Sequence, residues 1–222
     1  MSLAMDSEFR GDYLHLGLLL KMKIKEDMKR QVVVFDFDGT LTTCDTFGKF
    51  ICFALGRWRY YSGLLACFPI LVGYVLKIVP NYRAKEQLFG HFFRNTRYEV
   101  FVQLGKDFAN NIEPLMRIDT LSRLKRHIAD VAKIYVVSAS IEEWVRPIVE
   151  RYGNVTVLAT QVEVNNGVLT GHFLSKNCYG KEKIHRLLEI EPKREEYHLT
   201  AYGDSRGDKE MILQADCGIW IK

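Results

Sequence analysis

The stretch Val32-Val33-Val34-Phe35-Asp36-Phe37-Asp38-Gly39-Thr40 joins a short apolar run to two aspartates. The apolar run predicts a buried strand. Residues two apart in a strand share a face, so we expect Asp36 and Asp38 to project into one space beyond its carboxyl end. Ligands of open α/β sheets bind at that edge. Two close carboxylates repel each other unless a cation or a shared proton relieves them. The pair therefore indicates Mg²⁺ or acid–base chemistry, and two solvated aspartates in a turn are the plain alternative.

Three more apolar runs have the length and composition of strands, at 133–137, 155–159 and 197–202. Segments of helical periodicity separate them, and this alternation predicts βαβ units with a mostly parallel sheet. A short hairpin is expected within 162–170, because Asn166-Gly167 suits a turn that needs positive φ. The predicted fold class is α/β, a Rossmann-like parallel sheet with an inserted helical cap and a small β-hairpin flap.

The insertion lies between the first two strands, which are much farther apart than a crossover of about a dozen residues requires. Residues 46–116 carry aromatic and aliphatic side chains at helical spacing, with prolines as breaks, and are predicted to form the helical cap. The core is expected to comprise residues 31–45 and 117–222. Residues 1–30 are expected to be an N-terminal extension without a convincing signal peptide.

Composition excludes several classes of protein. The net charge is +4, and no Lys/Arg run is interleaved with aromatic residues, so we expect no nucleic-acid partner. The five cysteines are odd in number and lack C-x-x-C spacing, which argues against a disulfide framework and a zinc site. We therefore expect a reducing, cytoplasmic location.

Two further polar signals lie where a phosphate could bind. Ser138 follows the second apolar run, ahead of a helix expected to begin near Ser140 with a capping box to Glu143. A hydroxyl beside a helix N-terminus suits a phosphate oxygen, and a routine turn serine is the alternative. Lys183 opens a later helix, where a cation opposes the macrodipole and needs a negative partner. A solvated helix face is its alternative, and Lys181 competes for the role.

A second acidic pair follows the last long apolar run, in Gly203-Asp204-Ser205-Arg206-Gly207-Asp208. Asp204 would lie at another strand's carboxyl end, and Asp208 one helical turn later. Asp204 as a simple helix cap is the alternative. We treat the Arg-Gly-Asp tripeptide as coincidence. The acidic pair predicts a second group of carboxylates over the same edge of the sheet.

Taken in order, these motifs resemble those of the haloacid dehalogenase-like hydrolase superfamily: D-x-D-x-T, a strand-ending Ser or Thr, a Lys, and G-D-x-x-x-D. The resemblance implies that Asp36 is the nucleophile that forms an aspartyl-phosphate, and that Asp38 is the general acid and then the base. An acid of this kind has no use in halide departure, so Asp38 favours a phosphatase over a dehalogenase.

The resemblance also implies the ligands. A Mg²⁺ ion would be held by Asp36, Asp204 and the carbonyl of Asp38, with Asp208 as a further ligand or an anchor behind them. The phosphoryl oxygens would be bound by Ser138 and Lys183, and Thr40 would support the loop.

The position of the insertion is similar to that in the phosphoserine phosphatase-like branch. In that branch a glutamate nine residues after the nucleophile reads the substrate, and here the position is Asp45. We assign substrate recognition to Asp45, and the departure from glutamate puts phosphoserine in question.

Residues 60–76 form an uncharged, largely apolar stretch that is unusual for a cap. A spanning helix needs about 20 apolar residues, and this stretch is shorter and contains Pro69. We expect it to touch a membrane or hold an acyl chain, and the alternative is a buried helix pair broken at Pro69. The basic residues that flank the stretch suit anionic headgroups; they are Arg57, Arg59, Lys77, Arg83 and Lys85.

The apolar cap, Asp45-Thr46-Phe47-Gly48 and residues 178–183 resemble the phosphatidylglycerophosphatase C type of bacterial lipid phosphatase. The predicted function is Mg²⁺-dependent hydrolysis of a phosphomonoester on a phosphorylated small molecule or a lipid headgroup, at the inner face of the membrane if the substrate is a lipid such as phosphatidylglycerophosphate. The alternatives are a soluble-metabolite phosphatase, a catalytically idle membrane-binding protein, and a phosphomutase.

Overall fold

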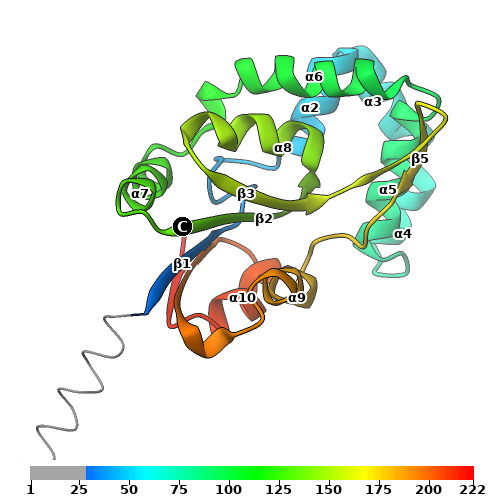
Figure 1. Cartoon of the computed structure of the whole chain (residues 1–222). Helices are drawn as coiled ribbons and strands as arrows, with labels where there is room; N and C mark the ends of the chain where they lie inside the picture. The colour runs from blue at the N-terminus through cyan, green and yellow to red at the C-terminus, as the bar shows by residue number, and fades with distance from the viewer. Residues whose placement is uncertain (1–28) are drawn as a thin grey trace, which may run out of the picture.

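The computed structural model describes residues 29–222, so the predicted N-terminal extension lies almost wholly outside the described residues. A five-stranded parallel sheet runs in the order β3-β2-β1-β6-β7 (Figure 1). Its strands are β1 (Arg30–Phe35), β2 (Lys133–Ile141), β3 (Val155–Thr160), β6 (Tyr197–Gly203) and β7 (Cys217–Trp220). The predicted Rossmann-like α/β fold is confirmed, with each expected strand in place.

The first apolar run forms the central strand because both of its faces are covered. Residues 32–35 of β1 are fully buried between β2 and β6. Val33 and Phe35 belong to one hydrophobic cluster, whereas Val32 and Val34 belong to another on the opposite face. This continuous burial is typical of a parallel strand sandwiched between helices.

Helices cover both faces of the sheet. The first cluster packs under α7 (Ile118–Ala129) and α8 (Glu142–Val149), and the second under α9 (Lys181–Ile190) and α10 (Lys209–Leu213). Figure 1 shows the two pairs on opposite sides of the strands. The short 3₁₀ helices are η1 (Glu113–Leu115), η2 (Glu150–Tyr152), η3 (Arg194–Glu196) and η4 (Arg206–Asp208).

The expected hairpin is present as β4 (Val162–Asn165) and β5 (Val168–Phe173). Its turn residues Asn166 and Gly167 have φ of 48° and 76°, the positive values for which the sequence pattern is suited. The hairpin packs against α5 through a close glycine contact, where a Cβ on Gly90 would lie 3.0 Å from the Gly171 carbonyl oxygen.

Five α-helices lie within residues 46–116, as the prediction of a helical insertion requires. They are α2 (Thr46–Leu55), α3 (Arg57–Ala66), α4 (Phe68–Val75), α5 (Asn81–Phe93) and α6 (Tyr98–Asn110). Phe50 of α2 stacks on Trp144 of α8 with ring centroids 4.3 Å apart. A Cβ on Gly105 of α6 would lie 2.2 Å from the Glu143 carbonyl oxygen, so α6 packs directly on α8. The insertion and the sheet therefore share one hydrophobic cluster. The boundaries of a separate cap domain at 46 and 116 stay a prediction.

The apolar stretch 60–76 forms α3 and α4, and the break falls at Cys67 rather than at Pro69. Pro69 lies in the first turn of α4, a position that tolerates proline because the missing N–H has no helical partner there. All eight residues of α4 are at least partly exposed, so the alternative of a buried helix pair is wrong. No helix among residues 29–222 has both the length and the apolarity to cross a bilayer.

Glu143 of α8 should make stability depend on pH. Burial raises the pKa of its carboxyl to about 7, while the Tyr98 hydroxyl donates to Oε1 at 3.1 Å. Because the folded-state pKa lies above the unfolded value, this group's contribution to stability is complete below about pH 4.5 and is lost as pH rises through 7. We expect Glu143→Gln to raise the free energy of unfolding by about 2 kcal/mol near pH 8.

Urea unfolding of the Glu143→Gln variant and the unaltered chain, from about pH 5 to about pH 8, measures this difference. The increase in the free energy of unfolding caused by Glu143→Gln should become smaller as the pH falls toward about 5. Glu150→Gln is the control, since Glu150 is exposed and pairs with Arg146 at the surface. A gain that is the same at every pH would contradict the assignment to ionisation of Glu143.

Candidate active site

A cleft of about 520 Å³ opens at the carboxyl end of the sheet. Asp36 directly follows β1 and Asp204 directly follows β6, and these two strands are neighbours. Parallel strands bring their carboxyl ends to one edge, so residues far apart in sequence meet there. The side chains that line this cleft and bear on chemistry are Asp36, Asp38, Asp45, Lys85, Arg117, Lys183 and Asp204.

Three of the predicted metal-ligating carboxylates lie together. Asp36, Asp204 and Asp208 each offer an oxygen within 4.8 Å of the others. Asp36 and Asp208 are buried, whereas Asp204 is exposed toward the cleft. Carboxylate oxygens are the ligands that Mg²⁺ prefers, and one exposed member leaves a route for the ion. The donor set therefore fits a hard divalent cation.

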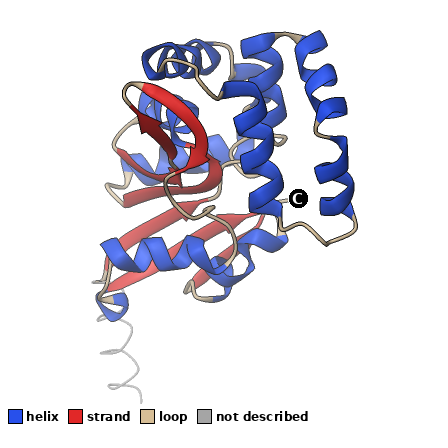
Figure 2. Cartoon of the chain, turned by 90° about the vertical axis from the view of Figure 1, so that its right-hand side faces the viewer, coloured by secondary structure: helices blue, strands red, loops and turns tan. Residues whose placement is uncertain are grey.

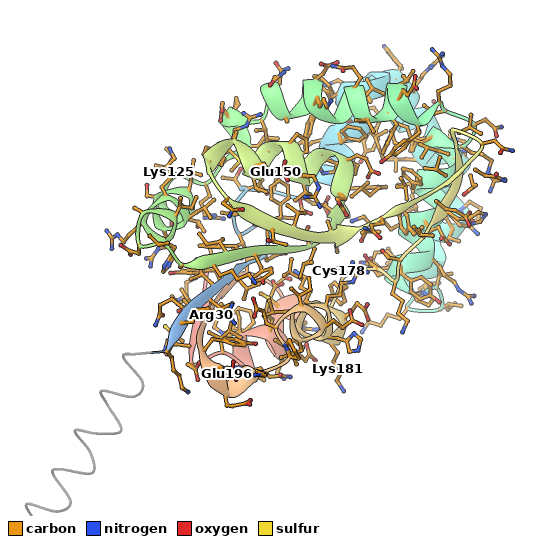
Figure 3. All side chains as sticks on the ribbon, viewed as in Figure 1. Arg30, Lys125, Glu150, Cys178, Lys181 and Glu196 are labelled. Atoms are coloured by element: carbon orange, nitrogen blue, oxygen red, sulfur yellow. The ribbon has the colours of Figure 1, made fainter. Side chains whose placement is uncertain are left out.

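Lys183 is the positive partner of this cluster. Its side chain is buried, and Nζ donates to Asp36 Oδ1 and, at 2.5 Å, to Asp208 Oδ1. Burial alone would lower the pKa of Lys183, but the two carboxylates outweigh it and raise the pKa. Lys181, the sequence-based competitor, is exposed on the outer side of α9 (Figure 3). Lys183 is thus the lysine that faces the carboxylates.

The environment of Asp36 is tuned by opposing effects. Burial raises its pKa to about 7, the neighbouring Asp208 adds to the rise, and Lys183 pulls it down. Burial and then Asp208 likewise raise the pKa of Asp204. A cation among these carboxylates would favour their ionised forms.

Asp38 is held apart from the three-carboxylate cluster. Its Oδ1 accepts from the backbone N–H of Thr46 at 2.8 Å and from the Thr46 hydroxyl at 2.6 Å, and its Oδ2 accepts from the Ser140 hydroxyl. Trp144 Nε1 in turn donates to the Thr46 hydroxyl at 3.2 Å. The side chain of Asp38 is therefore not among the grouped metal-ligating carboxylates of the described residues, and only its carbonyl is left for that part of the prediction.

The pKa of Asp38 lies above its usual value. Burial is the largest cause, and the charge of Asp45 adds to it. Lys85 and the hydroxyls of Ser140 and Thr46 oppose the rise. A raised pKa keeps a proton available, which suits a group that donates one to a leaving oxygen.

The expected capping box of Ser140 and Glu143 is wrong. The strand β2 continues to Ile141, α8 begins at Glu142, and Ile141 has no side-chain oxygen for the N-cap. The Ser140 hydroxyl is instead used by Asp38. A capping box does occur at η4, where Ser205 caps and Asp208 is its acidic partner, so Asp204 is not a helix cap.

Three predicted substrate residues have distinct surroundings. Thr40 is buried, with Oγ1 at 3.4 Å from both Asp36 Oδ2 and Asp204 Oδ1. Ser138 is also buried, and its Oγ accepts from the Ser140 N–H at 2.9 Å. Asp45 is exposed at the cleft, where it is the N-cap of α2 and accepts from Phe47 N–H at 2.8 Å.

Sequence reasoning missed two cations of the cleft. Arg117 donates to the carbonyl oxygens of Gly39 at 3.2 Å and Lys222 at 3.0 Å. Lys85 of α5 donates to the Ala139 carbonyl at 2.9 Å. Lys85 was expected beside the apolar stretch as a headgroup contact; its side chain lines the cleft, and contact with a headgroup stays a prediction. No spacing in the sequence links either cation to the aspartates.

Comparison with known proteins agrees with this geometry. A model of the haloacid dehalogenase-like hydrolase family matches residues 33–212. Protein CicA of Caulobacter vibrioides is 32% identical over 189 residues, which cover 83% of this chain and 83% of CicA. The matched region includes every predicted catalytic and metal-ligating position.

Solved structures share the fold at low sequence identity. A protein of unknown function from Bordetella pertussis superposes with a TM-score of 0.67 at 18% identity, covering 84% of this chain and 87% of that chain. A phosphoserine phosphatase, solved as an analogue of its phospho-aspartyl intermediate, gives a TM-score of 0.53 at 20% identity, covering 84% of each chain. These likenesses concern the fold alone.

Proposed function

The chain belongs to the haloacid dehalogenase-like hydrolase family, and we propose that this phosphatase hydrolyses a phosphomonoester through an aspartyl-phosphate on Asp36, with Mg²⁺ as cofactor. The resemblance to the superfamily is confirmed, and the chain shares its fold with a phosphoserine phosphatase. The observation that carries the proposal is the contact of Lys183 with Asp36, at the edge of the sheet where Asp204 and Asp208 also lie.

The first step is attack of an Asp36 carboxylate oxygen on phosphorus. The bond from phosphorus to the leaving oxygen breaks, and Asp38 gives that oxygen a proton. Lys183 and Ser138 bind the phosphoryl oxygens, where Lys183 stabilises the charge, and Thr40 supports the loop. Water then attacks the phospho-enzyme, Asp38 takes its proton, and Asp36 is regenerated with release of inorganic phosphate.

A divalent cation bound by Asp36, Asp204 and the Asp38 carbonyl, with Asp208 behind, would screen the repulsion between carboxylate and phosphate. Phosphatases of this family in general use such a metal, usually Mg²⁺. The three grouped carboxylates carry more negative charge than Lys183 neutralises, which supports the assignment.

Phosphate release with and without Mg²⁺ tests the proposal. We expect turnover to need Mg²⁺ and to stop on chelation with EDTA, because the carboxylate cluster then repels the substrate. The panel should hold phosphatidylglycerophosphate in mixed micelles, phosphoserine and several sugar phosphates. If no substrate releases phosphate, the alternative of a catalytically idle membrane-binding protein is favoured. Transfer of phosphate to an added alcohol instead of water would indicate a phosphomutase.

A lipid phosphate is the second candidate substrate, with contact at the inner face of a membrane. The exposed apolar residues of α3 and α4 favour it. Lys85 and Arg117 also offer positive charge in the cleft for an anionic group beyond the scissile phosphate. Preference for phosphoserine or a sugar phosphate over the lipid in the same panel would reject it.

Asp45 is the position that we assign to substrate recognition. We expect Asp45→Asn to change kcat/KM by about tenfold or more for the preferred substrate, because the charge that faces the cleft is lost. Asparagine is as good an N-cap as aspartate, so the start of α2 is kept. Asp45→Ala removes both the charge and the N-cap of α2. A lower thermal stability of Asp45→Ala than of Asp45→Asn would measure the effect of the lost cap. Unchanged kcat/KM for every substrate in Asp45→Asn would refute the assignment.

A further inference from the structure

The outer side of α3 and α4 carries a stripe of exposed large apolar side chains. Figure 2 shows these two helices end to end at the edge of the molecule, beyond α5. Within α3 and within α4 the stripe repeats at spacings of three and four, the period of one helix face. Trp58 is 90% exposed, and Leu65 and Val75 are each 75% exposed. The members of the stripe are Trp58, Tyr61, Leu65, Phe68, Val72 and Val75.

The stripe is not needed to attach these helices to the protein. The inner side chains pack against the hydrophobic cluster, and each directly precedes a member of the stripe, about 100° around the helix; they are Tyr60, Leu64, Cys67 and Leu71. The helices therefore have an inner apolar face that is used and an outer apolar face that is left in solvent. An exposed apolar surface of this kind marks an interaction site.

The charge around the stripe identifies the partner. From residue 46 to residue 85 the sequence has no Asp or Glu. Arg57 and Arg59 lie at one end of the stripe, and Lys77 and Arg83 lie beyond the other, all exposed. An apolar strip edged with cations, with Trp and Tyr at its border, suits an anionic bilayer. A second copy of this chain is disfavoured, because a two-fold contact places like surfaces together and would set cations against cations.

We propose that this α3–α4 stripe docks the protein on an anionic lipid bilayer, with the apolar side chains in the interface and the flanking cations at the headgroups. The geometry connects the stripe to the cleft. A cavity of about 460 Å³ beside α4 is lined by Ile70, Ile78 and Tyr82. Tyr82 also lines a cavity of about 760 Å³, which shares Asn81 and Tyr179 with the catalytic cleft. Docking would therefore place the path to Asp36 beside the lipid surface, and this last point rests on the proposed function.

Vesicle co-sedimentation tests the docking with the full chain and with vesicles of phosphatidylcholine, alone or mixed with phosphatidylglycerol. We expect binding to the mixed vesicles that weakens as salt is added. The combined variant Leu65→Ser, Phe68→Ser and Val75→Ser should lose at least about tenfold in affinity. The combined variant Ile118→Ser and Leu213→Ser is the matched control, since these residues are 81% and 70% exposed on α7 and α10. The control should bind within about twofold of the unaltered chain.

A second set separates charge from folding defects. Arg57→Gln with Arg59→Gln and Lys77→Gln leaves the apolar stripe intact and should lower affinity for the mixed vesicles by about fivefold per charge. Equal binding by the stripe and control variants would overturn the proposal. So would a stripe-dependent dimer in sedimentation velocity without vesicle binding, which would assign the stripe to a second copy.

Binding and turnover can fail independently. Asp36→Asn should dock like the unaltered chain, because docking requires no chemistry. If the protein binds vesicles but hydrolyses no substrate, the docking proposal is supported and the proposed function is refuted. If the protein hydrolyses phosphomonoesters but does not bind vesicles, the proposed function is supported and the docking proposal is refuted.

Discussion

Asp36→Asn is expected to lower phosphate release by at least about 10⁴-fold, while the protein stays folded. An amide of the same shape cannot attack phosphorus, so the covalent step is lost. Burial raises the pKa of Asp36 to about 7, which means that its charged form is disfavoured where it lies. A neutral asparagine avoids that cost, and Lys183 keeps Asp208 as a partner.

Single-turnover assays with excess enzyme, together with urea unfolding, measure both effects. We expect the free energy of unfolding to change by less than about 1 kcal/mol. Asp107→Asn on α6 is the control, because it makes the same change of residue type outside the cleft, where Asp107 contacts Gln103. Activity of Asp36→Asn above about 1% of the unaltered chain would refute the nucleophilic role.

Lys183→Met is expected to damage both stability and turnover. Its ammonium group is buried between Asp36 and Asp208, so its removal leaves two buried carboxylates facing each other without compensation. Breaking a buried ion pair in this way costs about 3 kcal/mol or more. Turnover should fall by about 10³-fold, because a donor to the phosphoryl oxygens is lost.

Urea unfolding with and without Mg²⁺ measures the effect on stability. Part of the lost stability should return on addition of Mg²⁺, because a cation among the carboxylates replaces the missing charge. Lys181→Met is the matched control two residues earlier, on the exposed side of α9, and should change neither quantity appreciably. A stable, active Lys183→Met would contradict the role that we give to this ion pair.

The part of the site that lies on strand ends was predictable from the sequence. A parallel sheet collects its carboxyl ends at one edge, and so Asp36, Asp204 and Asp208 meet once the strands are recognised. The four main strands and the hairpin turn were recognisable because their patterns are local. The spacing of apolar residues indicates each strand, and the Asn-Gly pair indicates the turn, each within a few residues of sequence.

The parts that were wrong or missed depend on how helices are oriented. Ser140 lies on a strand that runs three residues past Ser138 before the helix begins, so its hydroxyl meets Asp38 instead of capping. Lys85 points into the cleft because of the rotation of α5, which tertiary packing sets and no local pattern encodes. Thr46 reaches Asp38 for the same reason, through the placement of α2.

The stack of Phe50 on Trp144 has a consequence for how the protein unfolds. The two rings belong to the insertion and to α8, and both are completely buried. Pulling α2 away would strip Trp144 of its cover and expose a large apolar surface to water. Melting of the inserted helices and melting of the sheet should therefore coincide in one cooperative transition. The trimmed chain without residues 46–116 would have no stable interior of its own around Trp144.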